Sequence, residues 1–373
     1  MSRLAPLDGL RGTIVALMAL DHASAFIARP PERVSEFWAV SFPVYTEPLP
    51  FLVRVVTHLC APGFFLLMGA SVALFAADRA RRGWSESTIN RALWIRAGLL
   101  VIFQQIPVNL GWLAGSGSGG AGHIPGTGGD VLLYFGVLWG LGSAMAIVTT
   151  LRRLPAMALV VLALLCVVGV AFLLPTGAAA DAGTHPLLRL LLVPGQTGLL
   201  MVRYPTLPWL GLALLGMLFG RRLVQAPEQT MRASLPLGLA AIGGFVVVRL
   251  LGGVGNLRPP ADGWIGFFNV VKYPPSVAYQ LLTVGVNLLL MRWFVHAPPG
   301  RGPIGTFGRT ALFFYLIHLF VFAALSIPFR PDGTGVVGML PLWILGLAIL
   351  FPLCRWFDGV KRRAAPEAWV RYL

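Results

Sequence analysis

The amino-acid sequence predicts an all-α fold, in which residues 1–373 form a single polytopic bundle of transmembrane helices. Two observations carry this prediction. First, the chain is 57% hydrophobic and only 12% charged, whereas a soluble domain has about 25% charged residues; its mean hydropathy is +0.77. Second, apolar runs recur along the whole chain, separated by short segments rich in proline, glycine and arginine. A lipid bilayer is therefore the expected solvent for most of the surface.

About ten of these runs are predicted spans, because ~20 apolar residues in a helix cross the ~30 Å hydrocarbon core of a bilayer. We place them at residues 10–28, 58–77, 90–112, 131–150, 154–174, 205–220, 235–252, 276–296, 306–327 and 338–356. The segment 186–201 is apolar but short and is broken by Pro194-Gly195. We expect a re-entrant or interfacial helix there.

The arginine and lysine residues predict the orientation. Most of the 29 basic residues lie at span ends that fall on one side of the bundle, beginning with Arg3 and Arg11. Cytoplasmic loops carry such an excess, so both termini are expected in the cytoplasm and the chain in the cytoplasmic (inner) membrane, among membrane lipids. Topology thus explains the formal charge of +15, and no nucleic-acid partner is expected.

The first apolar run, Leu7 to His22, carries an arginine and a histidine eleven residues apart. Eleven steps of ~100° bring Arg11 and His22 to within ~20° of one direction on a helix, ~16 Å apart along its axis. If this helix spans the bilayer, Arg11 lies near the inner surface and His22 near mid-depth. An ionisable side chain at that depth is costly and indicates function.

Three histidines belong to predicted spans, and all three fall in the outer half of the membrane: His22, His58 and His318. A hydrogen-bonded core histidine is the simpler interpretation of each one, but burying three imidazoles at similar depth without purpose is unfavourable. No i, i+4 pair or glutamate partner supports zinc, so no metal is expected. A neutral His22 could act as a base. Because Asp21 lies ~100° round the helix, the group that orients this imidazole should come from another span.

Two arginines near the inner side, Arg11 and Arg96, each allow two interpretations. Arg11 could bind an anion or pair with Asp8, three residues before it. Arg96 could help bind that anion, or could extend to the inner surface. The same span carries Gln104, Gln105 and Asn109, a polar stripe that must face the protein interior or a cavity.

On the outer side, Arg203 precedes one predicted span and Lys272-Tyr273 precedes another. Each puts a cation and an aromatic ring at the membrane interface. Interfacial anchoring explains such a pair, and binding of an anionic or sugar-like group is the alternative.

These residues also carry a family resemblance. The Arg-x10-His pattern of Arg11 and His22, within LDGLRG…LMALDH, resembles the first-helix signature of integral-membrane acyltransferases. Within these enzymes, the chain resembles the bacterial branch of the heparan-α-glucosaminide N-acetyltransferase catalytic-domain family. The further motifs, in order, are His58-x3-Pro62-Gly63-Phe64-Phe65-x3-Gly69, YPTLPWLG, KYPPS and GRTALFFYLIH.

The resemblance covers nearly the whole chain and implies an enzyme of about ten helices. Such an enzyme takes an acyl group from cytoplasmic acyl-CoA and delivers it to a hydroxyl or amine, often of a sugar, on the far side. By position, His22 corresponds to the catalytic histidine and Arg11 to the residue near the CoA phosphates. The lysosomal member has its active histidine in the first luminal loop. Loop 29–57 has none, so His58 is the substitute.

We therefore predict a membrane acyltransferase with acetyl-CoA or another acyl-CoA as co-substrate. The donor is expected at Arg11, with Arg91 and Arg96 helping, because phosphates favour paired cations. The acceptor is expected to be a glycan or another small extracytoplasmic molecule, and a homodimer is left open. The predicted acceptor-binding residues are His318, Lys272, Tyr273 and Arg203.

Two other classes of protein are compatible with the sequence. A transporter or flippase of an anionic or lipid-linked solute would use polar residues at mid-depth to line a pathway. Its usual signature, paired broken helices in repeated halves, is missing except for Pro194-Gly195. A membrane scaffold would bind no CoA and carry no flux.

Overall fold

The structure is a computed structural model that describes residues 4–30, 36–39, 42–116, 131–174, 184–365, 368 and 370. Within these ranges, nine helical segments are long and apolar enough to cross a membrane. A further apolar helix, α6, is shorter, with 15 residues, and falls on the remaining predicted span, 131–150. The predicted all-α polytopic bundle is confirmed.

The helices follow the predicted spans to within a few residues at most ends. In chain order they are α1 (Ala5–Ala23), α2 (Pro48–Thr57), α3 (Cys60–Arg81), α4 (Glu86–Phe103), α5 (Asn109–Ser116), α6 (Val137–Leu151), α7 (Ala156–Leu164), α8 (Val170–Leu173), α9 (Pro186–Leu191), α10 (Thr206–Gln225), α11 (Pro227–Leu251), α12 (Gly263–Phe268), α13 (Val277–His296), α14 (Pro303–Arg309), α15 (Ala311–Ser326) and α16 (Gly335–Arg363). Three π-helical turns continue α1, α4 and α7, namely η1 (Ser24–Ala28), η2 (Gln104–Val108) and η3 (Leu165–Gly169). A 3₁₀ turn, η5 (Ile327–Phe329), follows α15.

Local sequence signals explain where several helices begin and end. Ser85 caps α4 by accepting a hydrogen bond from the backbone N–H of Thr88 at 3.2 Å, and Ser276 caps α13 in the same way through Tyr279 at 3.1 Å. Such caps satisfy N–H groups that have no partner inside the helix. α11 ends at Gly252, whose φ of 68° lies in the left-handed region that glycine adopts without strain.

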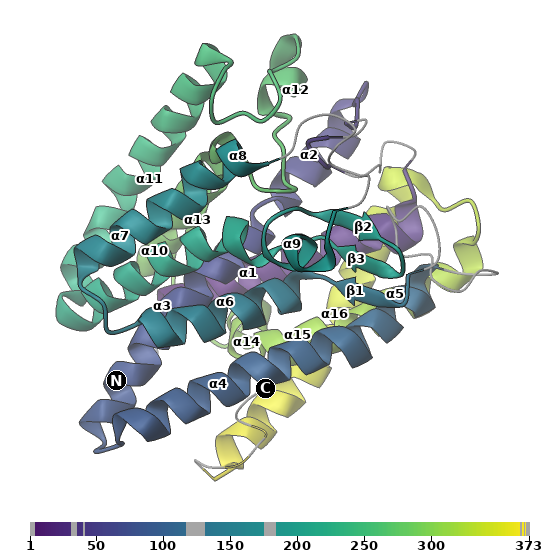
Figure 1. Ribbon diagram of the computed structural model, residues 1–373. Coiled ribbons are helices and arrows are strands. Elements are labelled where there is room, and N and C mark those ends of the chain that lie inside the picture. Colours follow the sequence, from purple (N-terminus) through teal and green to yellow (C-terminus); the bar gives the residue numbers. More distant parts are fainter. Residues whose placement is uncertain are drawn as a thin grey trace.

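Close helix contacts set the position of α1 in the middle of the bundle, where it packs against α3, α13, α14 and α15 (Figure 1). A Cβ atom added at Gly12 would lie 1.9 Å from the carbonyl oxygen of Ile304, so only glycine permits this approach of α1 to α14. The pair Gly216 and Gly220 has the same role, because Cβ atoms there would meet backbone of α3 at 2.2 and 2.6 Å. Small residues at a four-residue spacing permit such close packing of helices.

The two ends of the bundle can be identified from contacts. At one end, Gly308 of α14 touches Asp8 of α1, and Arg309 pairs with Asp358 of α16 at 3.0 Å. At the other end, the N–H of Thr334 donates to the carbonyl of Ile27 at 2.9 Å. The first turns of α1 and the last turns of α16 therefore lie at the same end, here called the inner end.

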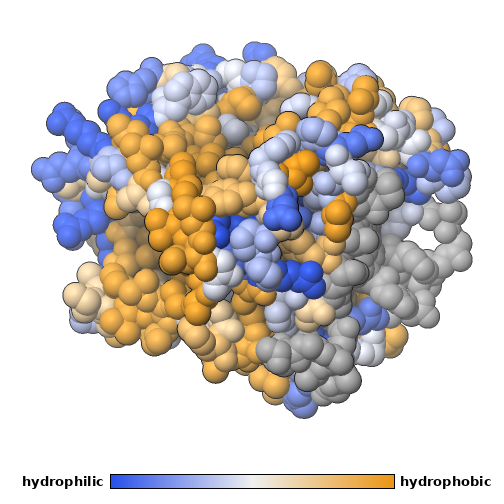
Figure 2. All heavy atoms as spheres, turned by 90° about the horizontal axis from the view of Figure 1, so that it is seen from above, coloured by the Kyte–Doolittle hydropathy of each residue, from blue (hydrophilic) through white to orange (hydrophobic). Residues whose placement is uncertain are grey.

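The surface fits a lipid environment. Figure 2 shows hydrophobic side chains over much of one face, with hydrophilic side chains gathered at its left edge. Large exposed apolar residues lie on the outward faces of the peripheral helices, such as Met157 on α7 (72% exposed) and Leu250 on α11 (74%). In water such a surface would aggregate, and in a bilayer it is the expected face of the protein.

A small sheet at the other end corrects the expectation of a helix over 186–201. Only α9 is helical there, and β2 (Gly195–Thr197) and β3 (Leu200–Val202) then form an antiparallel hairpin. β1 (Leu133–Phe135) pairs in parallel with β3, so the strand order is β1-β3-β2. Pro194 has no N–H to continue a helix, and Gly195 and Gly198 have φ values of 141° and 54° that other residues rarely adopt.

Candidate active site

His22 is positioned by the outer end of α1. It lies in the last turn of that helix, directly before the π-helical turn η1, and is 7% exposed. Isolated π turns often occur at functional sites, because the extra residue shifts the side chains around them. η1 ends at Arg29, a non-glycine residue with a φ of 50°. The backbone is thus locally irregular directly after His22.

His22 and His318 form a hydrogen-bonded pair across two helices. Nδ1 of His22 lies 2.5 Å from Nε2 of His318 on α15, and Nδ1 of His318 lies 2.6 Å from the carbonyl oxygen of Tyr315. A carbonyl oxygen only accepts, so His318 carries its proton on Nδ1 and accepts at Nε2. His22 then donates from Nδ1, and its lone pair lies on Nε2. His318 is the orienting group that was expected from another span.

Aromatic rings hold both imidazoles in this geometry. The ring of Trp112 meets His22 edge-on, with centroids 4.9 Å apart, and Phe314 stacks on His318 at 5.6 Å. These contacts restrict rotation of both imidazoles.

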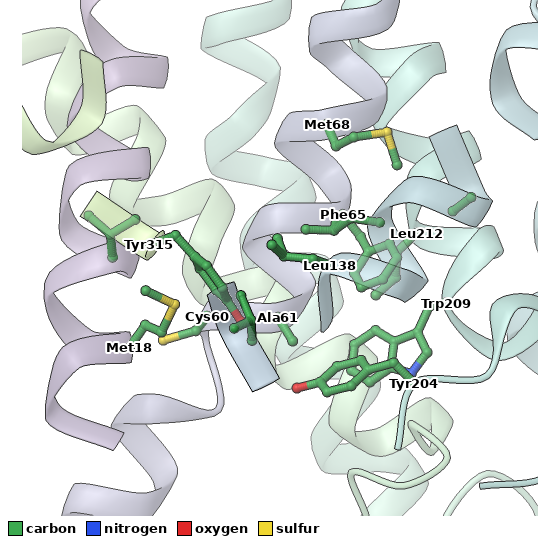
Figure 3. Packing of buried hydrophobic residues seen from close by; sticks show 14 of the residues in the cluster. Met18, Cys60, Ala61, Phe65, Met68, Leu138, Tyr204, Trp209, Leu212 and Tyr315 are labelled. Carbon is green, nitrogen blue, oxygen red and sulfur yellow. The ribbon is translucent and has the colours of Figure 1, made fainter. Parts of the chain in front are cut away.

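A cavity opens in front of His22, lined by residues from most of the central helices. Its polar and aromatic lining includes Asp21, His22, Ser24, Glu36, Tyr45, Arg54, Thr57, Gln104, Trp112, Tyr134, Arg203, Tyr204, Lys272, Tyr273 and Tyr315. Five of the seven tyrosines of the chain are in this wall. Figure 3 shows Met18, Cys60 and Tyr315 close together, with Tyr204 near Trp209, and all of these except Trp209 line the cavity.

The predicted polar stripe reaches this cavity and is satisfied internally. Gln104 is fully buried; its side-chain carbonyl accepts from the backbone N–H of Leu138 at 3.1 Å and its amide donates to Asn109 at 3.1 Å. Asn109 in turn donates to Gln105 at 3.1 Å. The stripe faces the protein interior, as predicted.

A cluster of charged residues forms another part of the wall. Arg54 donates to Asp21 at 2.5 Å and to both carboxylate oxygens of Glu36. His58 Nε2 lies 3.0 Å from Glu36. Burial alone would raise the pKa of Glu36, but Arg54 and His58 outweigh it and hold that pKa well below its usual range. Glu36 is therefore an ionised carboxylate in this wall.

His58 has a different environment from His22. His58 is 2% exposed, and its ring contacts Glu36. Its backbone carbonyl accepts a hydrogen bond from the hydroxyl of Tyr279 at 2.9 Å. It is not among the residues that line the cavity. The structure thus joins His22 with His318, and gives His58 a contact that positions Glu36.

Three of the four predicted acceptor-binding residues, Arg203, Lys272 and Tyr273, lie together in the cavity wall. The fourth, His318, does not line the cavity and instead contacts His22. The Arg203 guanidinium and the Lys272 ammonium lie 5.5 and 5.3 Å from the centroid of the Tyr273 ring. The Tyr273 hydroxyl is 3.2 Å from that of Tyr204. The small sheet adjoins this part of the wall, since the cavity residue Tyr134 is in β1 and Arg203 directly follows β3.

Arg11 lies toward the inner end and does not line the cavity that contains His22. It pairs with Asp8 at 2.9 Å and donates to Ser71 of α3 at 3.4 Å. This confirms one of the two interpretations of Arg11, the pairing with Asp8.

The other two predicted donor residues differ from each other. Arg96 lies 4.4 Å over the ring of Phe75, one turn from Ser71 on α3, so Arg96 and Arg11 both contact α3. Arg91 is exposed on α4. The structure therefore brings Arg96, and not Arg91, into contact with the helix that Arg11 touches.

Glu36, Arg54 and the tyrosine wall were not predicted. A signal for Arg54 exists, because it is the only charge in the apolar helix PLPFLVRVVT, and a charge in such a helix needs a partner. Glu36 gives no comparable signal, because it lies in a loop where a carboxylate is ordinary.

Comparison with known protein families identifies the family of this chain. A family model described as an acyltransferase domain matches residues 4–357. Among curated proteins, no match to the chain was found. The matched region contains both histidines of the pair and every residue of the cavity wall. The chain therefore belongs to the acyltransferase-domain family, as a multi-pass membrane acyltransferase.

Proposed function

We propose that this protein transfers an acyl group, most simply acetyl, from acyl-CoA bound from the cytoplasmic side to a hydroxyl or amine of a sugar-containing acceptor in the outer cavity. The single observation that carries the proposal is the hydrogen-bonded series from the carbonyl of Tyr315 through His318 to His22 at the cavity wall. The resemblance to heparan-α-glucosaminide N-acetyltransferases implies a sugar acceptor, and the distribution of basic residues favours the cytoplasmic (inner) membrane.

In this mechanism, Nε2 of His22 takes the proton from the attacking hydroxyl or amine. The oxygen or nitrogen attacks the thioester carbonyl, the carbon–sulfur bond breaks, and the CoA thiolate leaves with the proton that His22 releases. While His22 is protonated, its Nδ1–H still donates to His318, whose lone pair stabilises the positive charge. This matches the role of the orienting group in a catalytic triad, played here by an imidazole.

The tyrosine-rich wall supports the sugar acceptor. Ligand sites combine aromatic surface with a few placed polar groups, and the C–H faces of a sugar ring pack well on aromatic rings. The hydroxyls of Tyr204 and Tyr273 supply hydrogen-bonding groups that suit a polyhydroxylated ligand.

The inner end supports the acyl-CoA donor. Arg11 and Arg96 both contact α3, at Ser71 and Phe75, and guanidinium groups bind phosphates well. Val15 and Met18 lie between Arg11 and His22 on the same face of α1. The pantetheine arm of the donor would pass along this face to bring its thioester to His22, where the apolar surroundings limit hydrolysis.

The test is turnover by the purified full-length protein in lipid nanodiscs, with acetyl-CoA, a panel of glycans, and detection of the released CoA thiol. Wild-type protein should release thiol only when an acceptor is present, and His22→Ala should abolish this release. The matched control is His296→Ala, because His296 is exposed on α13 and takes no part in the site. Acceptor-dependent turnover that survives His22→Ala would remove His22 from the mechanism.

A further inference from the structure

Lys272 has an unusual environment for a lysine. It lies between α12 and α13, is 3% exposed, and lines the cavity. The backbone next to it is held in place, because the N–H of Trp38 donates to the carbonyl of Tyr273 at 3.1 Å and the N–H of Tyr273 donates to the backbone carbonyl of Glu36 at 3.3 Å. Its ammonium contacts the ring of Tyr273 and makes no hydrogen bond or ion pair with any residue in the described ranges.

The carboxylates in the cavity wall do not neutralise this lysine. Among the lining residues that the structure describes, the carboxylates are Asp21 and Glu36. Both are bound by Arg54, and Glu36 is also bound by His58. A buried ammonium without a counter-ion is unfavourable, and the described part of the cavity wall offers Lys272 no carboxylate of its own.

We infer that the acceptor is acidic: it carries a carboxylate that pairs with Lys272 while another of its groups faces His22. This inference rests on the proposed function and narrows its acceptor to a sugar of the uronic-acid class. The aromatic wall receives the ring face, and Lys272 binds the substituent that distinguishes an acidic sugar from a neutral one. Lys272 is then a specificity-determining residue, because a neutral sugar would leave its charge buried and unpaired.

The experiment measures the binding of matched ligand pairs by calorimetry, without a donor, so that the result does not depend on turnover. The pairs are methyl β-D-glucuronide with methyl β-D-glucoside, and methyl α-D-galacturonide with methyl α-D-galactoside. Wild-type protein should bind the acidic member of at least one pair tenfold or more tightly than its neutral partner. Lys272→Met should reduce this preference to less than threefold, and Lys272→Arg should retain most of it.

The chain offers a matched control, since its other lysine is Lys361 near the inner end of α16. Lys361→Met should keep the wild-type preference. Equal or undetectable binding of both members in every pair would overturn the inference, as would a preference that survives Lys272→Met.

A second measurement distinguishes a role of Lys272 in acceptor binding from a role in the chemical step. With acetyl-CoA present, Lys272→Met should raise KM for the acidic acceptor and leave kcat within about twofold. A loss of kcat that is equal for acidic and neutral acceptors, with KM unchanged, would instead assign Lys272 to stabilising the tetrahedral oxyanion and would contradict the acidic acceptor. If the wild-type protein binds the acidic sugars but never releases CoA, the proposed function is wrong, whereas the inference that the cavity binds an acidic sugar is supported.

Discussion

Nε2 of His318 lies 2.5 Å from Nδ1 of His22. His318 thus occupies the position that a carboxylate occupies next to the histidine of a catalytic triad. The contact joins two residues that are 296 positions apart in the chain and lie on different helices. A neutral imidazole in this position fixes the tautomer of His22 without adding a buried negative charge. The arrangement suits a site within the membrane, where an unpaired carboxylate would be costly.

We predict that His318→Phe lowers kcat by about 10²-fold, because His22 loses the acceptor that keeps its proton on Nδ1 and its lone pair on Nε2. KM for both substrates should change little, since His318 does not line the cavity. Steady-state kinetics of thiol release measure both constants. An unchanged kcat in a folded His318→Phe variant would mean that the pair is only structural.

The sequence predicted the position of His22 but not its partner. The eleven-residue spacing follows from helix geometry alone, so the depth of His22 and the shared face with Arg11 could be derived from α1 by itself. Contact with His318 depends instead on how α1 packs against α15, which the spacing of residues within either helix does not specify. For the same reason Arg54 and Glu36, which come together from α2 and the preceding loop, could not be paired in advance.

The fold was predictable to a greater degree than the site. Span positions depend on local hydropathy, and the structure confirms them for the long helices. The hairpin β2-β3 was missed because its apolar composition resembles a short helix. Its direction is set by Pro194, Gly195 and Gly198, and pairing with β1 across more than sixty residues completes it.

The second prediction concerns the path of the donor along α1. Met18 lies one turn before His22 on the same face, lines the cavity, and is 5% exposed. We expect Met18→Trp to lower kcat/KM for acetyl-CoA by at least about tenfold, because the indole would fill the space that the thioester needs.

The control is Met157→Trp, which places the same side chain on the exposed face of α7, where Met157 is 72% exposed. It should leave kcat/KM close to the wild-type value. A Met18→Trp variant with wild-type kcat/KM would show that the donor reaches His22 by another route.

The third prediction concerns Arg54 and stability. Arg54 binds both Asp21 and Glu36, and the Glu36 side chain is only 2% exposed. Removing one partner of a buried charge cluster costs about 3–5 kcal/mol, because the remaining charges are left unpaired. We expect Arg54→Met to reduce the free energy of unfolding by an amount near the lower figure, since Arg54 itself is 18% exposed.

Chemical denaturation in detergent measures this change, and Arg232→Met is the control, because Arg232 is 76% exposed on α11 and has a partner only at 3.8 Å. Equal losses in the two variants would mean that the Arg54 cluster contributes nothing beyond a surface ion pair.

The last prediction concerns the pH dependence of stability through Glu36. Its folded-state pKa is held well below the usual range, because Arg54 and His58 outweigh the opposing effect of burial. A carboxylate with a lowered folded-state pKa adds stability that is fully present above its unfolded pKa of about 4.3 and is lost as the pH falls through the folded pKa.

At pH 7, Glu36→Gln should therefore have a clearly lower Tm than wild type. Below about pH 4 this difference should shrink, because the unfolded wild-type chain then binds a proton at Glu36 that the folded protein does not. The exposed Glu228 gives the control variant Glu228→Gln, with a side chain 87% exposed and no expected effect at either pH. A Tm difference between wild type and Glu36→Gln that is the same at pH 7 and at pH 3 would contradict the ionised state of Glu36.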